Sequence, residues 1–323
     1  MVHVRSHIYR LADIWVSRRR RVCGPRAVPT DARSPVVVIT GASEGLGLAL
    51  AHVIAREPAS IVMVARRPEP LKQAMQAVIA AAPRARVLCL ALDIGRDDAG
   101  DVRAAYVDEH RLYVDVLINN AGIGVGGPFS EIAARDVETL LATNVTGATR
   151  LMHRFLGEMR ARGRGGVLNI ASLAAFAPGP WQALYFASKA YLLSLTAAVA
   201  SECAGEGVRV CAIACGPFET GIHVKMGAAT TLYRALIPSD TADRMARRSW
   251  HAFRMGHPVV IPGFLNGALA WWMRALPFEL IVPLLNVLMK PRRWEFGLRL
   301  GASRKAIAAR AAYAARARRS RLG

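Results

Sequence analysis

The sequence predicts an α/β protein with a doubly wound parallel sheet, helices on both faces of that sheet, and an extra helical segment at the C-terminal end. Short apolar runs alternate along the chain with segments of helical spacing, which is typical of βαβ units. The apolar runs are nearly continuous, as expected for strands that are buried on both faces. With 323 residues, of which 53% are hydrophobic, the chain can bury a large core around such a sheet.

The first predicted strand spans residues 36–40, where three valines and an isoleucine lie between Pro35 and Gly41. A helix follows at 46–56 and ends before Pro58, which cannot continue it. The same reading predicts further strands at 60–65, 85–92, 114–118, 166–171 and 208–214. The helices that connect them are predicted at 68–82, 96–110, 130–141, 145–162 and 182–204. Because these connections join parallel strands, we expect right-handed crossovers.

Beyond Gly216 the alternation is less regular. Residues 218–257 are mixed in composition, and residues 259–261 supply a candidate last strand. We therefore divide the chain into three parts: a basic N-terminal extension (1–34), an α/β domain (35–263), and a C-terminal extension (264–323) that is first apolar and then arginine-rich and helix-prone.

The net charge of +20 belongs mainly to the two ends of the chain. Residues 1–34 carry +6 and residues 290–323 carry +10, so the remaining 255 residues carry only +4. Such ends attract anionic lipid or nucleic acid, or they are simply solvated in an arginine-rich chain, and both explanations stay open. Because the nearly neutral body has no basic module with interleaved aromatic residues, we expect no specific nucleic-acid partner.

Composition excludes several classes of protein. The apolar content is too high for a disordered or collagen-like chain. The five cysteines form no C-x-x-C pair, and their odd number fits a reducing compartment better than a disulfide scaffold. Charged residues interrupt the only candidate signal peptide, and no run of about 20 uncharged apolar residues without proline predicts a spanning helix. We expect a cytoplasmic protein.

A glycine-rich turn lies directly between the first strand and the first helix. It contains Gly41, Ser43, Gly45, Leu46 and Gly47 in the spacing G-x-x-x-G-x-G. Glycines allow a tight turn and let the backbone approach a pyrophosphate, whose charge is stabilised by the helix N-terminus. An ordinary glycine-rich turn would look the same, but its place between strand and helix favours a dinucleotide site.

Arg66 and Arg67 follow the second strand, about 20 residues after the glycines. An acidic residue at this place would bind the ribose 2′-hydroxyl of NAD, whereas arginine suits the 2′-phosphate of NADP. In so arginine-rich a chain the pair could arise by chance. The absence of any Asp or Glu from Ser60 to Arg67 favours NADP(H) as the cofactor.

Two further motifs lie near the expected carboxyl ends of the strands. Asn120 and Gly122 belong to an Asn-Asn-Ala-Gly tetrad after the fourth strand. Tyr185 and Lys189 lie four residues apart on a predicted helix, and Ser172 ends the fifth strand. A nearby ammonium favours a phenolate, and the resulting lower pKa would let Tyr185 exchange protons near neutrality. Either motif alone would be explained by turn or core packing; together they predict an active site.

At this point the sequence resembles the short-chain dehydrogenase/reductase family over roughly residues 35–263. The resemblance is carried by the order and spacing of Gly41, Gly45, Gly47, Asp93, residues 119–122, Asn144, Ser172, Tyr185 and Lys189. It implies a Rossmann fold with Tyr185 as catalytic acid/base, Ser172 positioning the substrate oxygen, and Lys189 lowering the tyrosine pKa and binding the nicotinamide ribose. It further implies that Asn144 holds a water in a proton relay.

The resemblance also implies that Asp93 and Asn120 line the adenine and ribose sites and that Thr220 contacts the nicotinamide side. Two positions depart from the family pattern. Cys215 stands where the family usually has proline before glycine, which bears on the geometry of the cofactor loop. Glu44 stands where NADP enzymes often carry a basic residue, which counts against NADP.

The C-terminal extension contains an apolar stripe at helical spacing, formed by Leu265, Leu269, Trp272, Met273 and Leu276, with Trp271 beside it. Core packing is the default explanation of such a stripe. Basic residues flank it, however, as in helices that lie in a membrane interface, so peripheral contact with an anionic membrane is the second explanation. Prolines 277 and 283 argue against a membrane-spanning helix.

The leading hypothesis is an NADP(H)-dependent oxidoreductase that interconverts a carbonyl and its alcohol, with a small lipophilic molecule as substrate and no metal. The alternatives are a catalytically silent nucleotide-binding sensor or scaffold and, less favoured, a nucleic-acid-binding protein that uses its basic tails. A homo-oligomer is compatible with the sequence. The identity of the substrate and the physiological direction are not encoded in any motif of this chain.

Overall fold

The computed structural model describes residues 33–57, 59–218, 226, 231–233 and 239–290. Within this part of the chain the fold is the doubly wound α/β architecture that the sequence predicts. Seven parallel strands form one sheet in the order β3-β2-β1-β4-β5-β6-β7. The strand order reverses between β1 and β4, which places a crevice outside the carboxyl ends of these two strands.

The strands of the sheet are β1 (Ser34–Thr40), β2 (Ser60–Ala65), β3 (Arg86–Ala91), β4 (Leu112–Asn119), β5 (Gly165–Ser172), β6 (Val208–Cys215) and β7 (Val259–Val260). The α-helices are α2 (Gly45–Ile54), α3 (Pro68–Ala81), α4 (Ala99–Glu109), α5 (Ala134–Leu141), α6 (Ala148–Arg162), α7 (Ala183–Glu202), α10 (Ala242–Arg254), α11 (Phe264–Ala275) and α12 (Phe278–Met289). Three short segments, η1 (Phe129–Glu131), η2 (Ala142–Gly147) and η3 (Leu173–Phe176), join the larger elements.

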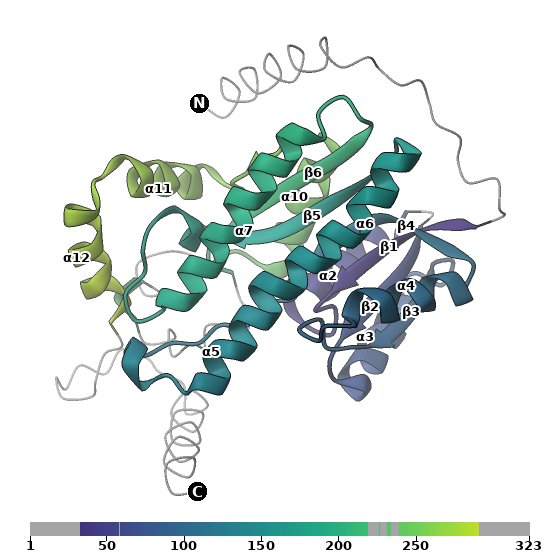
Figure 1. Cartoon of the computed structure of the whole chain (residues 1–323), viewed down its shortest axis with the longest axis horizontal. Coiled ribbons are helices and arrows are strands. Elements are labelled where there is room, and N and C mark those ends of the chain that lie inside the picture. The colour runs from purple at the N-terminus through teal and green to yellow at the C-terminus, as the bar shows by residue number, and fades with distance from the viewer. Residues whose placement is uncertain (1–32, 58, 219–225, 227–230, 234–238, 291–323) are drawn as a thin grey trace, which may run out of the picture.

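Two separate layers of core lie on the two faces of the sheet, because successive side chains of a strand point to opposite faces. Val37 and Ile39 of β1 pack in one cluster with α2, α3 and α10. Val36 and Val38 pack in the other cluster with α4, α6 and α7. Helices therefore cover both faces of the sheet, as Figure 1 shows.

The structure departs from the predicted helix boundaries in the middle of the chain. A helix was expected over 130–141, but Ile132 and Ala133 are extended and separate η1 from α5. The first three residues of the helix expected over 145–162 belong to the π-helical segment η2, and regular α6 begins only at Ala148. π-helical turns are found frequently at functional sites, because they displace side chains from the regular helical pattern.

The C-terminal extension forms two helices where it is described. Leu276 is extended, with φ −80° and ψ 136°, and Pro277 precedes the first turn of α12. The residue before a proline is sterically restricted from the α conformation, so α11 ends there. Pro283 lies inside α12. The two helices lie together at one edge of the molecule, opposite the edge formed by β3 and α3 (Figure 1).

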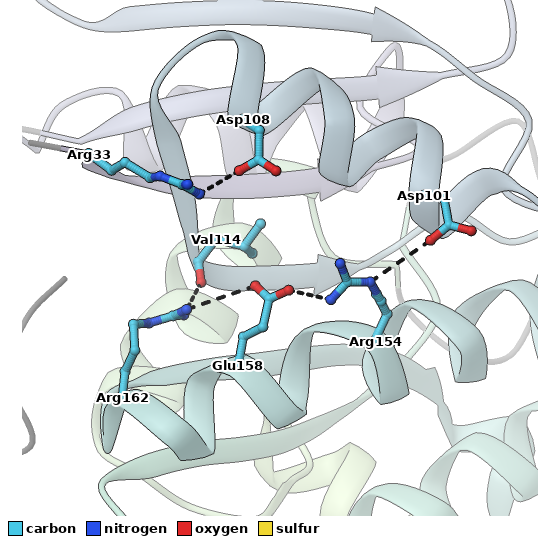
Figure 2. Close-up of polar contacts among 7 residues, drawn as sticks. All are labelled: Arg33, Asp101, Asp108, Val114, Arg154, Glu158 and Arg162. Atoms are coloured by element: carbon cyan, nitrogen blue, oxygen red, sulfur yellow. Dashed lines mark hydrogen bonds and ion pairs between the residues drawn. The ribbon is translucent and has the colours of Figure 1, made fainter. Parts of the chain in front are cut away.

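Ion pairs between neighbouring elements involve many of the body's arginines. Figure 2 shows Arg154 of α6 between Asp101 of α4 and Glu158 of its own helix, while Arg162 contacts Glu158 and donates to the carbonyl oxygen of Val114. Solvent-exposed pairs of this kind contribute at most about 1 kcal/mol each.

Candidate active site

One cavity of about 590 Å³ lies at the carboxyl ends of the central strands. Its volume falls in the range of small-molecule and cofactor sites. At one end it is lined by the glycine turn and the ends of β2 and β4, and at the other by α11 and α12. The cavity collects most of the predicted site residues: Gly41, Ser43, Gly45, Leu46, Arg66, Asp93, Asn120, Gly122, Ser172, Tyr185 and Lys189.

The glycine turn has the backbone geometry that the sequence predicts. Gly41 and Gly45 adopt positive φ angles of 67° and 60°, a region that side chains rarely occupy. A Cβ atom built on Gly47 would lie 2.3 Å from the carbonyl oxygen of Gly41, so only glycine fits there. No side chain caps the first turn of α2, and Gly45 and Leu46 of that turn line the cavity. The turn thus fits a dinucleotide pyrophosphate, whose oxygens would accept hydrogen bonds from these backbone N–H groups.

Asn120 braces the glycine turn from the neighbouring strand. Its side-chain amide donates to the carbonyl oxygens of Thr40 (2.9 Å) and Gly41 (3.2 Å). The Thr40 hydroxyl in turn accepts from the backbone N–H groups of Asn120 and Ala121, both at 3.0 Å. Thr40, the last residue of β1, therefore supports the site, although the sequence analysis did not select it as a site residue.

Two arginine–carboxylate pairs flank the far side of the turn. Arg66 lies 4.0 Å from Asp93, whose other oxygen accepts a hydrogen bond from the backbone N–H of Gly95 at 2.9 Å. Arg67 lies 3.6 Å from Glu44. All four side chains of these two pairs line the cavity and remain largely exposed. Both arginines are thus placed where a phosphate group could bind, in competition with their carboxylate partners.

Ser172, Tyr185 and Lys189 come together from β5 and the first turns of α7. The Ser172 side chain interacts with Tyr185 and acts to lower its pKa, and its oxygen accepts a hydrogen bond from the backbone N–H of Ala174 at 3.2 Å. The Lys189 Nζ atom donates to the carbonyl oxygen of Ile170 at 2.8 Å and lies 5.8 Å from the centre of the Tyr185 ring. A Cβ atom built on Gly122 would lie 3.4 Å from the same Nζ atom, so the Asn-Asn-Ala-Gly tetrad also reaches this point.

Burial dominates the ionisation of these groups. It raises the pKa of Tyr185 to about 12, against the opposing effect of the interaction with Ser172. Burial likewise lowers the pKa of Lys189 to about 8. The sequence analysis expected a lowered pKa for Tyr185. In the structure the opposite holds, because the free energy of removing the phenolate from water is larger than the contribution of the interaction with Ser172.

Asn144 and Gly47 do not line the cavity. They contact the backbone segments that form its wall. Asn144 lies in the π-helical segment η2, where its amide oxygen accepts from the backbone N–H of Ile123 and its nitrogen donates to the Ile123 carbonyl, both at 2.8 Å. The same nitrogen donates to the Ser188 hydroxyl at 3.1 Å. Asn144 therefore fixes the backbone next to Gly122. Ser188 was not selected from the sequence, since a serine inside a helix has no distinctive pattern.

The remaining predicted positions have mixed outcomes. Thr220 lies outside the described residues. Cys215 ends β6 and lines the cavity near Tyr185 and Lys189, and burial raises its thiol pKa to about 12. Among the described residues, no group of three or more His, Cys, Asp or Glu side chains is placed to hold a metal ion. The apolar end of the cavity was not selected as a site from the sequence; it is lined by Phe186, Met226, Tyr233, Leu269, Met273 and Leu285.

The fold and this cavity together define a class of protein: a nicotinamide-dependent oxidoreductase of the Rossmann type. The family described as short chain dehydrogenase matches residues 35–230. Because this match covers more than half of the chain, the chain belongs to the short-chain dehydrogenase family. It is accordingly an NAD(P)-dependent oxidoreductase that acts on alcohols and carbonyl compounds.

Similar proteins are consistent with this assignment. The chain is 34% identical over 196 residues to a ketoacyl reductase, HetN, of Nostoc, covering 60% of this chain and 68% of that protein. It is 33% identical over 224 residues to human 17-beta-hydroxysteroid dehydrogenase type 1, covering 68% of this chain and 65% of that protein. A short-chain dehydrogenase from Sphingobium yanoikuyae, solved in complex with NADPH, superposes with a TM-score of 0.65 at 28% identity and covers 75% of this chain and 96% of its own.

Proposed function

We propose that this protein is an NADP(H)-dependent reductase or dehydrogenase that interconverts a lipophilic carbonyl compound and its alcohol, with Tyr185 as the catalytic acid/base. The observation that carries the proposal is the convergence of Ser172, Tyr185 and Lys189 inside a cavity that is polar at the glycine turn and apolar at α11 and α12. A hydroxyl or carbonyl group at Tyr185 would have the polar end on one side and apolar side chains on the other.

The preference for NADP(H) rests on Arg66 and Arg67. Both line the cavity at the end of β2, beside which a dinucleotide bound in a fold of this type would have its adenosine ribose. The solved relative from Sphingobium yanoikuyae is in complex with NADPH, which supports the same choice. When bound, the cofactor supplies or accepts the hydride.

The chain's own residues would handle the proton and the orientation of the substrate. With a pKa of about 12, the Tyr185 phenol stays protonated near neutral pH and is able to donate to the oxygen of a carbonyl substrate. Ser172, which lines the same cavity, would hold the same oxygen. The charged form of Lys189 would favour the phenolate that remains after the proton leaves. Asn144 would keep the backbone of the Asn-Asn-Ala-Gly tetrad in place. A water molecule beside Asn144 would return a proton to the Tyr185 phenolate.

The lipophilic character of the substrate follows from the far end of the cavity. Leu269 and Met273 of α11 and Leu285 of α12 line it. Contact with these side chains would favour the binding of an apolar substrate by about 25 cal/mol for each Å² of apolar surface that is removed from water. One relative carries a hydroxysteroid dehydrogenase name, which is consistent with a bulky apolar substrate.

A panel of ketones and aldehydes of increasing apolar size, assayed by NADPH absorbance, tests the proposal. We expect turnover that rises with apolar size and is lost, by a factor of at least about 10³, in Tyr185→Phe. NADPH binding should persist in that variant. Tyr191→Phe is the matched control, since Tyr191 is half-exposed on the same helix and its hydroxyl contacts Thr149. Near-native turnover in Tyr185→Phe, or no turnover with any member of the panel, would refute the proposal.

A further inference from the structure

The helices α11 and α12 each have two apolar faces. One face of each helix is buried: Ala270 and Met273 of α11 and Ile281 and Leu285 of α12 belong to the core cluster that also contains Phe186. Leu285 and Met273 also line the cavity. The inner faces of the two helices therefore complete the substrate end of the site, and the stripe expected from the sequence is partly core.

The outer face of α11 is apolar and open to solvent. Phe264 and Leu265 are exposed by 85% and 71%, and Trp271 and Trp272 by 48% and 55%. Single exposed apolar side chains are normal on soluble proteins, but a contiguous group of large ones marks an interaction surface. Four such residues on one helix of twelve residues form such a group.

The outer face of α12 continues the same surface. Phe278, Leu280, Leu284 and Val287 are exposed by 51–65%, and the last three follow the i, i+4, i+7 spacing of one helical face. These two helices carry eight of the fourteen large hydrophobic residues that are exposed in the described part of the chain. The outer faces of α11 and α12 are called the apolar face below.

Basic residues lie at the C-terminal ends of the two helices that carry the apolar face. Within residues 264–290 Glu279 is the one acidic residue, whereas Arg274 and Lys290 are exposed at the ends of α11 and α12. The chain continues from Lys290 into a segment that holds ten more basic residues and one acid up to residue 323.

This charge distinguishes between the two simplest occupants of the apolar face. A second copy seated on it would bring two segments of net charge +10 together, and like charges oppose such contact. An anionic lipid surface attracts the same segments, by about 1 kcal/mol for each basic residue close to it. Tryptophan side chains such as Trp271 and Trp272 are enriched at the interface of membranes.

The length of the helices fixes how they would meet a bilayer. Each has twelve residues, or about 18 Å, which is shorter than the ~30 Å of hydrocarbon that a spanning helix must cross. In the described part of the chain α7 has the length and hydropathy of a spanning helix, but it packs on β5 and β6 and carries Tyr185 and Lys189. Contact through α11 and α12 is therefore interfacial.

We propose that α11 and α12 dock the protein on an anionic membrane surface through the apolar face, so that lipophilic substrate enters the cavity from the lipid. The entry of substrate rests on the function proposed above; the docking does not. The geometry links the two, because the same pair of helices carries the exposed apolar side chains outside and cavity-lining side chains such as Met273 and Leu285 inside. Figure 1 shows both helices at the periphery, where a planar surface can reach them.

Vesicle co-sedimentation of the full chain, without cofactor or substrate, tests the docking. We expect pelleting with phosphatidylcholine–phosphatidylglycerol vesicles at low salt, little with phosphatidylcholine alone, and a partial loss as salt rises. Leu284→Gln combined with Val287→Gln should weaken binding to anionic vesicles at least about tenfold, since both side chains are exposed and would leave the lipid. Met255→Gln is the control, an exposed apolar residue at the end of α10.

Three results would overturn the docking. The protein staying in the supernatant with anionic vesicles at low salt is one, and equal binding of the Leu284/Val287 variant and the wild type is another. The third is a lipid-free dimer by light scattering that the same double variant converts to monomer. Since none of these readouts uses activity, a failure of the oxidoreductase proposal leaves them unaffected.

The entry of substrate has its own readout. For a ketone dissolved in anionic vesicles, the apparent KM of the Leu284/Val287 variant should rise about tenfold over the wild type, whereas KM for a water-soluble ketone and kcat for both should stay the same. Equal KM values for the two forms with the vesicle-borne ketone would exclude entry from lipid while leaving the reductase activity established.

Discussion

The Nζ atom of Lys189 lies 5.8 Å from the centre of the Tyr185 ring, one helical turn along α7. Both side chains are buried, and burial shifts their pKa values in opposite directions, upward for the phenol and downward for the ammonium. Between about 8 and 12 both groups are neutral, and below about 8 only the lysine is charged. The two groups thus set different pH limits on the same reaction.

This relationship predicts how the rates depend on pH. Carbonyl reduction needs protonated Tyr185, which persists to about pH 12, and benefits from charged Lys189, which is lost as pH rises through about 8. The rate of reduction should therefore be flat below about pH 8 and fall above it, by up to about tenfold per pH unit. Oxidation needs the phenolate and should rise with pH. The pH profiles of kcat/KM in both directions check this, because kcat/KM reports the pKa values of the free enzyme.

The variant Lys189→Arg separates the contribution of the charge at position 189 from that of the protonation of Tyr185. A guanidinium stays charged throughout the accessible range. If the variant folds and binds cofactor, the alkaline fall in reduction should shift beyond the measured pH range. A fall at the same pH in Lys189→Arg and the wild type would assign it to another group.

Cofactor preference follows from the arginines after β2. NADPH should bind more tightly than NADH by about 1.5–3 kcal/mol, the scale of a charge-assisted hydrogen bond. Arg66→Ser should remove most of that difference and leave NADH affinity nearly unchanged, because NADH lacks the 2′-phosphate that Arg66 would bind. Calorimetric titration of the wild type and the variant with both cofactors measures the difference in affinity between NADPH and NADH. Equal affinities in the wild type would contradict the assignment to NADP.

Glu44 supplies a second test of the same site. Its carboxylate lies 3.6 Å from Arg67, and both side chains are about 60% exposed. Glu44→Gln should leave Arg67 available to a phosphate and tighten NADPH by about fivefold or less, as befits an exposed ion pair. NADH affinity should stay within experimental error. Weaker NADPH binding in this variant would show that Glu44 has a different role.

The close packing of the glycine turn predicts contrasting effects of two Gly→Ala substitutions. In Gly47→Ala the new Cβ would meet the Gly41 oxygen at 2.3 Å and the Asn120 amide nitrogen at 2.5 Å. We expect a loss of stability of about 1–3 kcal/mol and at least tenfold weaker cofactor binding. Gly157→Ala, on an exposed face of α6 with nothing within 4 Å, should instead stabilise by about 0.5–1 kcal/mol. Urea unfolding and cofactor titration compare them.

A buried chain of polar groups behind the site predicts a further effect on stability. Asn119 of β4 donates to the Asn169 side chain at 2.9 Å, and Asn169 donates to the Thr196 hydroxyl of α7 at 2.8 Å. Thr196→Val keeps the shape but removes this acceptor, and should lower the free energy of unfolding by about 1–3 kcal/mol. Thr139→Val, on the exposed face of α5, should change it by less than about 0.5 kcal/mol. An equal effect of both would show that the buried chain contributes nothing specific.

Much of the fold was predictable because its signals are local. Alternating apolar runs and helical segments define the order of strands and helices, and β2 begins and ends at the predicted residues. The glycine turn was identified because a positive φ at Gly41 and close contact at Gly47 leave few alternatives to glycine. The sequence analysis did not divide the apolar C-terminal segment into two helices, whereas in the structure α11 ends at Ala275 because Leu276 is extended before Pro277.

The sequence by itself determined the order of elements, the doubly wound sheet, and the residue types that meet at its carboxyl ends. Only the tertiary structure decided the pKa of Tyr185 and the hydrogen bonds by which Thr40 and Ser188 support the site. It also decided that α11 and α12 each bury one apolar face and expose another to solvent. Secondary structure depends mainly on residues that are close together in the sequence, so the spacing of apolar and turn-forming residues predicts it. Burial and cross-strand hydrogen bonds depend on residues far apart in the chain, and these meet only when the sheet and its helices have packed.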